Sequence, residues 1–331
     1  MRISQFGRYA LSLSIAVLLL AGCGGNLSSS TSTMPMVESQ PATPLHRGGI
    51  DHLYVDAAIG FSSSEILGYR IKGDRPTLIC KVKNVTYADN IAVDGKGNLI
   101  APNSASGQLI VFKGPRMCGP ELGSVNDLYG QPTAAASNDA ASGPIVVGNL
   151  LGPGFVVVCT MASSGCSELK SPPSGIGQVA GVAMANNGDC WASGYNASFS
   201  RVILVYFKRC SRSGRVATGY QNTGSGGLDI DAQGNLVSIS WAGSQGSAAY
   251  VYQGCNPKCS LVGGPLALQY QAIQGHLNGA STALATVDVL KSQVDVYSYS
   301  PTNVTYQYSF NNGISGGATV AGVAYNPRSK E

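Results

Sequence analysis

The chain has 331 residues, a formal net charge of +4 and only 11% charged residues. No basic stripe, Arg-rich helix or RNP-like aromatic motif stands out, so the composition argues against a nucleic-acid partner. Gly, Ser, Thr and Asn are abundant, which suits a chain with many tight turns that works outside the cytoplasm.

The N-terminus reads as an export signal. Arg2 and Arg8 precede an apolar run over residues 10–21 that is too short for an ordinary membrane span. The run ends in Leu20-Ala21-Gly22-Cys23, which resembles a bacterial lipobox. The resemblance implies that residues 1–22 are a signal peptide and that the Cys23 thiol carries a diacylglycerol anchor. The alternative is a plain secretory signal with an incidental cysteine.

Residues 23–50 are rich in Ser, Thr and Pro and have no apolar periodicity, which predicts a disordered tether. Gly24, rather than Asp, follows Cys23. The lipoprotein resemblance then implies the outer membrane or the cell surface of the bacterial envelope rather than the inner membrane. Removing residues 1–22 takes away two arginines and no acid, so the side-chain charge becomes 19 − 17 = +2.

A strand-turn-strand pattern over residues 228–254 organises the rest of the chain. An alternating apolar segment leads into Asp231-Ala232-Gln233-Gly234-Asn235, a hairpin turn in which Gly can take positive φ and Asp can bind turn amides. Residues 236–240 and 249–252 follow as two further strands. Related turns occur at residues 94–98 and 185–189, so Asp94, Asp189 and Asp231 are predicted to be structural.

The third strand of this pattern recurs at a regular interval. Its aligned positions are Tyr69, Phe112, Cys159, Tyr206, Tyr252 and Tyr297, in steps of 43, 47, 47, 46 and 45 residues. An all-β repeat of this length is the mark of a β-propeller with four-stranded blades. The sequence therefore predicts an all-β, six-bladed β-propeller over residues 51–331.

The ends of the chain predict how the ring closes. The first copy begins at residues 52–55 with what matches a second strand, and residues 320–325 match a first strand with nothing after it. We expect the C-terminal strand to complete blade one.

The strand-turn-strand units resemble those of the NHL and SMP-30-like six-bladed propellers. The SMP-30-like lactonases imply a metal-binding Glu just before the second strand of blade one, where this chain has Ile50-Asp51-His52-Leu53. The lactonase metal set is therefore not reproduced, and Asp51 or Asp56 is the candidate substitute.

Eight cysteines remain after Cys23, an even number in an exported chain, which favours disulfides. Strand positions predict the pairs Cys159–Cys166, Cys190–Cys210 and Cys255–Cys259, which leaves Cys80 for Cys118 across neighbouring blades. The alternative is a four-cysteine metal site, but the chain has no CxxC pair.

The resemblance to six-bladed propellers implies a functional site at the mouth of the central channel. The residues expected there, in loops entering first strands and leaving second strands, are Asp56, Asn90, Asn103, Asn149, Tyr195, Trp241, His276 and Asp288. Such a cluster could hold Ca²⁺ or another divalent metal through oxygen ligands. The alternative is that these residues cap turns and solvate a polar channel.

Other chemistry has weaker support in the sequence. His46 lies in the tether, His52 at the start of the domain and His276 in a degenerate repeat, so no histidine cluster for a lyase is expected. No Gly-x-Ser-x-Gly elbow is present to make a serine hydrolase.

Three functions are compatible with these observations. The leading hypothesis is a monomeric, lipid-anchored envelope protein that binds or scaffolds a protein or glycan without catalysis and needs no cofactor. The alternative is a metal-dependent hydrolase or lyase of the SMP-30-like superfamily. The third is a propeller with a purely structural role.

Overall fold

The computed structural model describes residues 50–60, 63–138, 143–151, 155–161, 165–171, 175–211, 213–222, 224, 226–241, 246–269 and 271–326. The predicted signal peptide, Cys23 and the tether before Ile50 lie outside these residues. No helix in the described part is long and apolar enough to cross a membrane.

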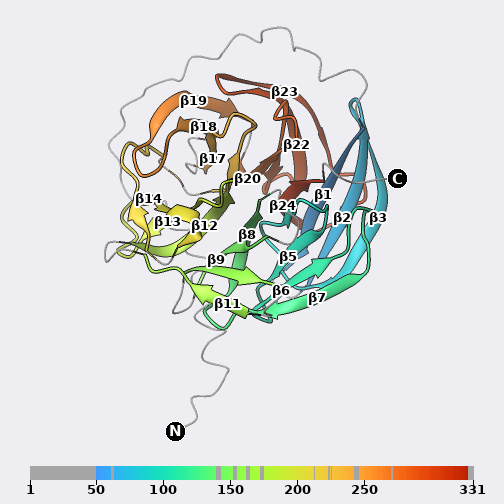
Figure 1. The fold of residues 1–331 in the computed structure, drawn as a ribbon. Coiled ribbons are helices and arrows are strands. Elements are labelled where there is room, and N and C mark those ends of the chain that lie inside the picture. Colours follow the sequence, from blue (N-terminus) through green and yellow to red (C-terminus); the bar gives the residue numbers. More distant parts are fainter. Residues whose placement is uncertain are drawn as a thin grey trace. The chain divides into compact units, whose positions relative to one another are not determined.

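The described residues form six antiparallel sheets of four strands each, arranged as blades in a ring (Figure 1). The predicted six-bladed β-propeller is confirmed. In order from the innermost to the outermost strand, blade 1 consists of β24 (Thr319–Tyr325), β1 (Ile50–Ile59), β2 (Ser63–Lys72) and β3 (Arg75–Val85), and blade 2 of β4 (Ala92–Val93), β5 (Leu99–Asn103), β6 (Gln108–Phe112) and β7 (Glu121–Asn126). Blade 3 consists of β8 (Pro132–Ser137), β9 (Ile145–Asn149), β10 (Val156–Thr160) and β11 (Gly165–Glu168), and blade 4 of β12 (Ile176–Met184), β13 (Cys190–Asn196), β14 (Val202–Phe207) and β15 (Arg215–Val216). Blade 5 consists of β16 (Leu228–Ile230), β17 (Leu236–Trp241), β18 (Ser247–Gln253) and β19 (Ser260–Leu268), and blade 6 of β20 (Ala272–Leu277), β21 (Ala283–Asp288), β22 (Gln293–Ser300) and β23 (Asn303–Phe310).

Blade 1 closes the ring as predicted. Strand β24 pairs antiparallel with β1, with Leu53 opposite Tyr325 and Val55 opposite Val323. The first and last strands of the propeller thus share one sheet, and the pairing leaves no open edge between the two ends of the repeat.

Each pair of neighbouring blades shares an apolar core. Between blades 6 and 1, for example, Leu53 and Val55 pack with Ala285 and Val287. The third-strand positions read from the sequence point into these cores, with one difference in blade 4. There Phe207 faces blade 3 as its equivalents face their preceding blades, whereas Tyr206 faces blade 5, so the repeat is displaced by one residue in this blade.

The turns between first and second strands are built by their aspartates. Asp231 Oδ1 accepts hydrogen bonds from the amides of Gln233 (3.0 Å) and Asn235 (2.8 Å), and Gly234 has a φ of 80°. Asp94 binds its own turn amides in the same way. These carboxylates hold hairpins, as the sequence predicted.

All four predicted disulfides are confirmed: Cys80–Cys118, Cys159–Cys166, Cys190–Cys210 and Cys255–Cys259. The first joins blades 1 and 2, and the other three lie within single blades. Four disulfides indicate an oxidising, extracytoplasmic setting.

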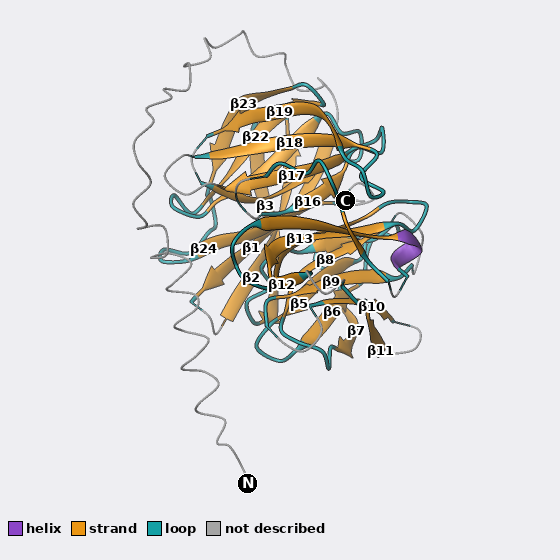
Figure 2. Cartoon of the chain, turned by 90° about the vertical axis from the view of Figure 1, so that its left-hand side faces the viewer, coloured by secondary structure: helices purple, strands orange, loops and turns teal. Residues whose placement is uncertain are grey.

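The ring has two faces that differ in the connections they carry. We call the face with the turns between first and second and between third and fourth strands the turn face; the 3-10 helix η1 (Lys208–Cys210), purple in Figure 2, marks it. The opposite face carries the connections between second and third strands and between successive blades, and we call it the loop face. The described chain begins on the turn face, because Ile50 pairs with Lys72 at the end of β2.

Candidate functional site

Three of the predicted site residues occupy equivalent positions at the loop-face ends of second strands. Asn103, Asn149 and Asp288 end β5, β9 and β21 and are 6%, 0% and 0% exposed. Asn103 Oδ1 accepts a hydrogen bond from the Thr86 amide (3.0 Å), and Asp288 Oδ1 accepts one from the Leu290 amide (3.0 Å). Asn103 and Asp288 therefore each hold a connection of their own blade.

The other loop-face candidates belong to blades 2, 4 and 5. Asn90 is buried, and its backbone amide donates to the Thr133 carbonyl of the next blade (2.9 Å). The half-buried ring of Tyr195 stacks on Phe199, with ring centroids 6.5 Å apart. Trp241 ends β17, and its Nε1 has no hydrogen-bond partner in the described part of the chain.

His276 lies away from these residues, toward the turn face. In the β20–β21 pair, Asp288 stands opposite Ala272, whereas His276 stands opposite Ala285, and four strand residues span about 13 Å. His276 Nδ1 lies 2.8 Å from the Leu277 carbonyl oxygen and 3.6 Å from Asp229 Oδ2. The structure thus gives His276 local partners and does not bring it to Asp288.

Asp56 is the one predicted residue whose surroundings point to chemistry. It is fully buried in β1, and within the described residues neither of its carboxylate oxygens has a hydrogen-bond partner. Its strand neighbour in β24 is Gly322. A Cβ added at Gly322 would collide with the carbonyl oxygen of Asp89, so this glycine lets the segment that enters blade 2 approach Asp56.

Asp56 and Asp89 form a coupled pair of acids, which we call the aspartate pair. Burial raises the pKa of Asp56 well above its usual range, and the charge of Asp89 raises it further, while polar contacts with the Ser64 side chain and the Asp89 backbone offset only part of this rise. Burial also raises the pKa of Asp89 to about 7, although this side chain keeps some exposed surface. Acids whose environments separate their pKa values in this way are typical of acid–base sites.

Tyr87 belongs to the same cluster. Its pKa is raised, first by the charge of Asp89, then by burial and by Asp56. Tyr87 and Asp89 both adopt left-handed backbone conformations, with φ of 54° and 55°. Such conformations are costly for residues other than glycine and tend to gather at functional sites.

Sequence reasoning selected Asp56 and Asn90 but missed Asp89 and Tyr87. The signal available was position: both missed residues lie in the connection that enters the first strand of blade 2, beside Asn90. The sequence did not show the role of Gly322 in β24, which lies more than 200 residues after Asp89 in the chain. This glycine allows the connection to approach Asp56.

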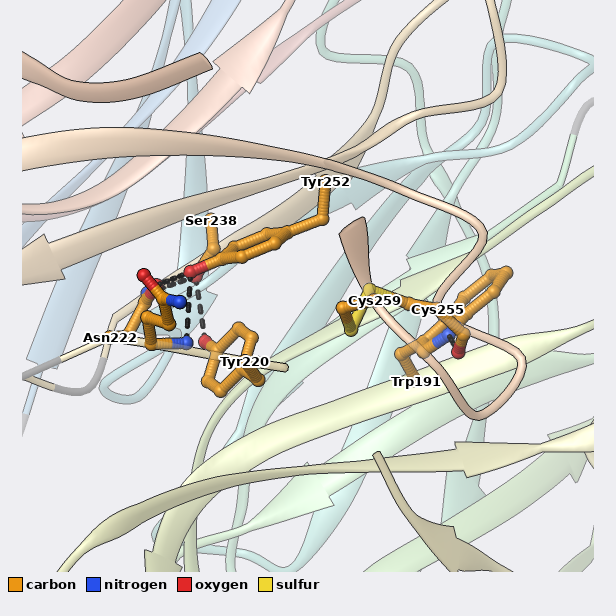
Figure 3. Close-up of a disulfide and its surroundings, with 8 residues drawn as sticks. Trp191, Tyr220, Asn222, Ser238, Tyr252, Cys255 and Cys259 are labelled. Atoms are coloured by element: carbon orange, nitrogen blue, oxygen red, sulfur yellow. Dashed lines mark hydrogen bonds between the residues drawn. A yellow bond between two sulfur atoms is a disulfide. The ribbon is translucent and has the colours of Figure 1, made fainter. Parts of the chain in front are cut away.

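Blade 5 shows the contrasting case of a polar cluster that is satisfied internally (Figure 3). Asn222 accepts a hydrogen bond from the Tyr252 hydroxyl (2.7 Å) and donates to Ser238 Oγ (2.6 Å), which also lies 2.8 Å from the Tyr220 hydroxyl. Nearby, Trp191 Nε1 donates to the Cys255 carbonyl (2.6 Å). Networks of this kind satisfy their own polar groups and hold a connection in place.

No group of three or more His, Cys, Asp or Glu side chains that could hold a metal occurs among the described residues. The aspartate pair would supply two carboxylates, which are hard oxygen ligands of the kind that Ca²⁺ and Mg²⁺ prefer. The absence of hydrogen-bond partners at both Asp56 oxygens has two explanations. The carboxyl group retains its proton, or its oxygens bind such an ion.

No protein-family model and no curated protein sequence matches the chain. Solved structures share its fold at low identity. A crystal structure of a nidogen/laminin complex matches at 12% sequence identity with a TM-score of 0.64, covering 85% of this chain and 100% of the matched chain. The periplasmic gluconolactonase PpgL of Pseudomonas aeruginosa matches at 13% sequence identity with a TM-score of 0.56. The match covers 84% of this chain and 99% of that chain. A putative 6-phosphogluconolactonase of Bacteroides fragilis matches at 10% sequence identity with a TM-score of 0.56. The match covers 86% of this chain and 99% of that chain.

Proposed function

We propose that this propeller is a hydrolase that opens lactones or related small esters, with the aspartate pair as its acid–base centre. The observation that carries the proposal is the partly exposed Asp89, with a pKa of about 7, beside the fully buried and partnerless Asp56. Two of the structures that share the fold are named as lactonases, which supports the choice of substrate class by analogy.

The roles of the residues follow from their burial and charge. Ionised Asp89 takes a proton from the water molecule that attacks the substrate carbonyl carbon, and it returns the proton to the departing ring oxygen, so that water adds across the ester bond. Asp56 is buried and keeps its proton beside ionised Asp89, so it acts as a positioning residue. The Tyr87 phenol also stays protonated and is a neutral donor within the electrostatic reach of Asp89.

If a divalent cation takes part, Asp56 and Asp89 are the residues that would hold it. The ion would polarise the substrate carbonyl and lower the pKa of bound water.

The test is hydrolysis of a panel of sugar lactones, followed by acid release, with the wild type, Asp89→Asn and the control Asp127→Asn. Asp127 is also a buried loop-face aspartate, but its Oδ1 accepts the Tyr129 amide (2.9 Å). We expect Asp89→Asn to lower kcat by about 10²–10⁴-fold and Asp127→Asn to change it little. The wild-type rate should rise with pH through about 7. Failure of the wild type on every lactone, in EDTA and with each divalent metal, would reject the proposal.

Non-enzymatic binding of a protein or glycan remains the second candidate, because one observation favours it. Ile59, Leu128, Phe199 and Leu290 are large apolar side chains that are 41%, 85%, 59% and 67% exposed, and all four lie at loop-face strand ends or connections. The other exposed large apolar side chains among the described residues lie on outer strands: Ile79, Leu122, Leu261 and Val262. Exposed apolar groups gathered on one face are typical of interaction surfaces. If no lactone is hydrolysed, binding of envelope glycans to the wild type and to Phe199→Ser is the next measurement.

A further inference from the structure

Exposed cations are concentrated on the turn face. They lie in the turns of blades 1, 2, 4 and 5, where the exposed side chains are Lys72, Arg75, Lys96, Lys113, Arg116, Lys208, Arg209 and Lys258. The connections of the loop face carry three in the described residues, Lys170, Arg201 and Lys291. The asymmetry cannot be seen in the sequence because each turn contributes one or two of these cations and successive turns are far apart along the chain.

The acids of the turn face are mostly inside the protein. Asp94, Asp189 and Asp231 are 9%, 8% and 4% exposed and accept hydrogen bonds from turn amides. Among the described residues, two exposed acids remain in this region, Asp74 in the β2–β3 turn and Glu121 at the start of β7, together with the half-buried Asp51 and Asp229. What this face presents outward is therefore predominantly positive.

Four of these cations are available to a partner. Within the described part of the chain, Lys72, Lys113, Lys208 and Lys258 take part in no ion pair. The turns that carry these four lysines lie on blades 1, 2, 4 and 5. The positive charge is therefore spread around the ring rather than focused on one point. A spread of this kind matches a planar anionic surface better than a small anion.

The chain also enters the propeller on this face. Ile50 pairs with Lys72, and the Asn326 amide donates to the His52 carbonyl beside it (2.7 Å). The segment that carries the predicted anchor at Cys23 is therefore attached at the cationic face.

We propose that the turn face docks on an anionic phospholipid surface. Each Lys or Arg near such a surface contributes to attraction, and a cationic patch adds to the binding of a lipid-anchored chain. The attraction acts within about 8–10 Å at physiological salt, so it orients the propeller once the chain is held nearby. In this orientation the loop face, with the aspartate pair, is turned away from the lipid.

The test is co-sedimentation with phosphatidylcholine vesicles that do or do not contain phosphatidylglycerol. The protein is the chain from residue 24 onward, exported through a cleavable signal, so that no acyl group contributes; every blade, core cluster and disulfide lies within residues 50–326. The variant combines Lys72→Gln, Lys113→Gln, Lys208→Gln and Lys258→Gln, and the matched control combines Lys170→Gln, Arg201→Gln and Lys291→Gln. Circular dichroism verifies that all three proteins are folded.

We expect binding that requires phosphatidylglycerol and weakens as salt is raised. The partition coefficient should fall by about fivefold for each turn-face lysine removed, and the loop-face control should stay within about twofold of the wild type. Equal binding to both kinds of vesicle, or equal loss in the two variants, would overturn the proposal. So would loss of binding in Phe199→Ser with Leu290→Ser, which would place the other face on the lipid. Binding to heparin or duplex DNA without binding to vesicles would replace the lipid surface with a soluble polyanion.

Discussion

Asp56 differs from the other buried carboxylates of the loop face in having no hydrogen-bond partner for either oxygen. Asp127 and Asp288 each bind the amide of a nearby loop residue, which compensates for part of their desolvation. A buried carboxylate without such partners is costly in its charged form and retains its proton instead. The folded chain therefore holds protons on the aspartate pair at pH values where the unfolded chain has released them.

This difference predicts how stability depends on pH. The pKa of Asp89 is raised from 3.8 to about 7 in the folded chain, and that of Asp56 is raised as well. The stability these groups contribute is fully present below about pH 4 and is lost as pH rises through about 7. Relative to Asp56→Asn with Asp89→Asn, the wild type should lose on the order of 2–4 kcal/mol of unfolding free energy between pH 4 and 8.

Denaturant titration of the two proteins at several pH values measures this loss. Parallel pH profiles would show that the pair titrates alike in the folded and unfolded chains. If EDTA lowers the wild-type stability at pH 8 and leaves the double variant unchanged, a divalent cation occupies the pair.

At the scale of elements, the repeated tyrosines explain why the sequence period was visible. In blades 1, 5 and 6 the hydroxyls of Tyr69, Tyr252 and Tyr297 hydrogen-bond the backbone of the connection that enters the same blade, at Asn312, Gln221 and Gln269. A ring that fills the core while its hydroxyl holds a connection is constrained in both size and polarity. Features that recur in each blade for such local reasons can be read from the sequence.

The candidate site could not be read in the same way. Asp56 and Asp89 belong to different blades, and each looks like an ordinary loop or strand residue in its own repeat. Their approach depends on Gly322 in β24, which is a contact between the two ends of the propeller. The cysteine pairs were predictable because most of them join adjacent strands of one blade, where the pairing pattern places them.

The disulfides differ in the length of chain they close, and this predicts unequal contributions to stability. Cys80–Cys118 spans 38 residues and joins two blades, whereas Cys255–Cys259 spans four within one turn. Constraint of the unfolded chain should make the first worth about 4 kcal/mol and the second about 2 kcal/mol. Thermal unfolding of Cys80→Ser with Cys118→Ser, compared with Cys255→Ser with Cys259→Ser, measures the difference. A larger loss in the second pair would contradict the ranking.

At the scale of the whole molecule, β24 closes the ring and shapes the candidate site at once. Val320 and Val323 pack into the core between blades 6 and 1, and Gly322 lies between Asp56 and the Asp89 backbone. A substitution in β24 should therefore change both the cooperativity of unfolding and the pKa values of the aspartate pair.

A chain truncated before Thr319 lacks the inner strand of blade 1, so we expect it to lose its cooperative thermal transition. A peptide of residues 318–326, added in trans, should restore the transition because it offers the same strand pairing and the same apolar side chains. The matched peptide with Gly322→Ala should restore it poorly, since a Cβ at that position would collide with the Asp89 carbonyl oxygen. Equal rescue by the two peptides would mean that the connection entering blade 2 can move away from β24, and Asp89 would then not be held beside Asp56.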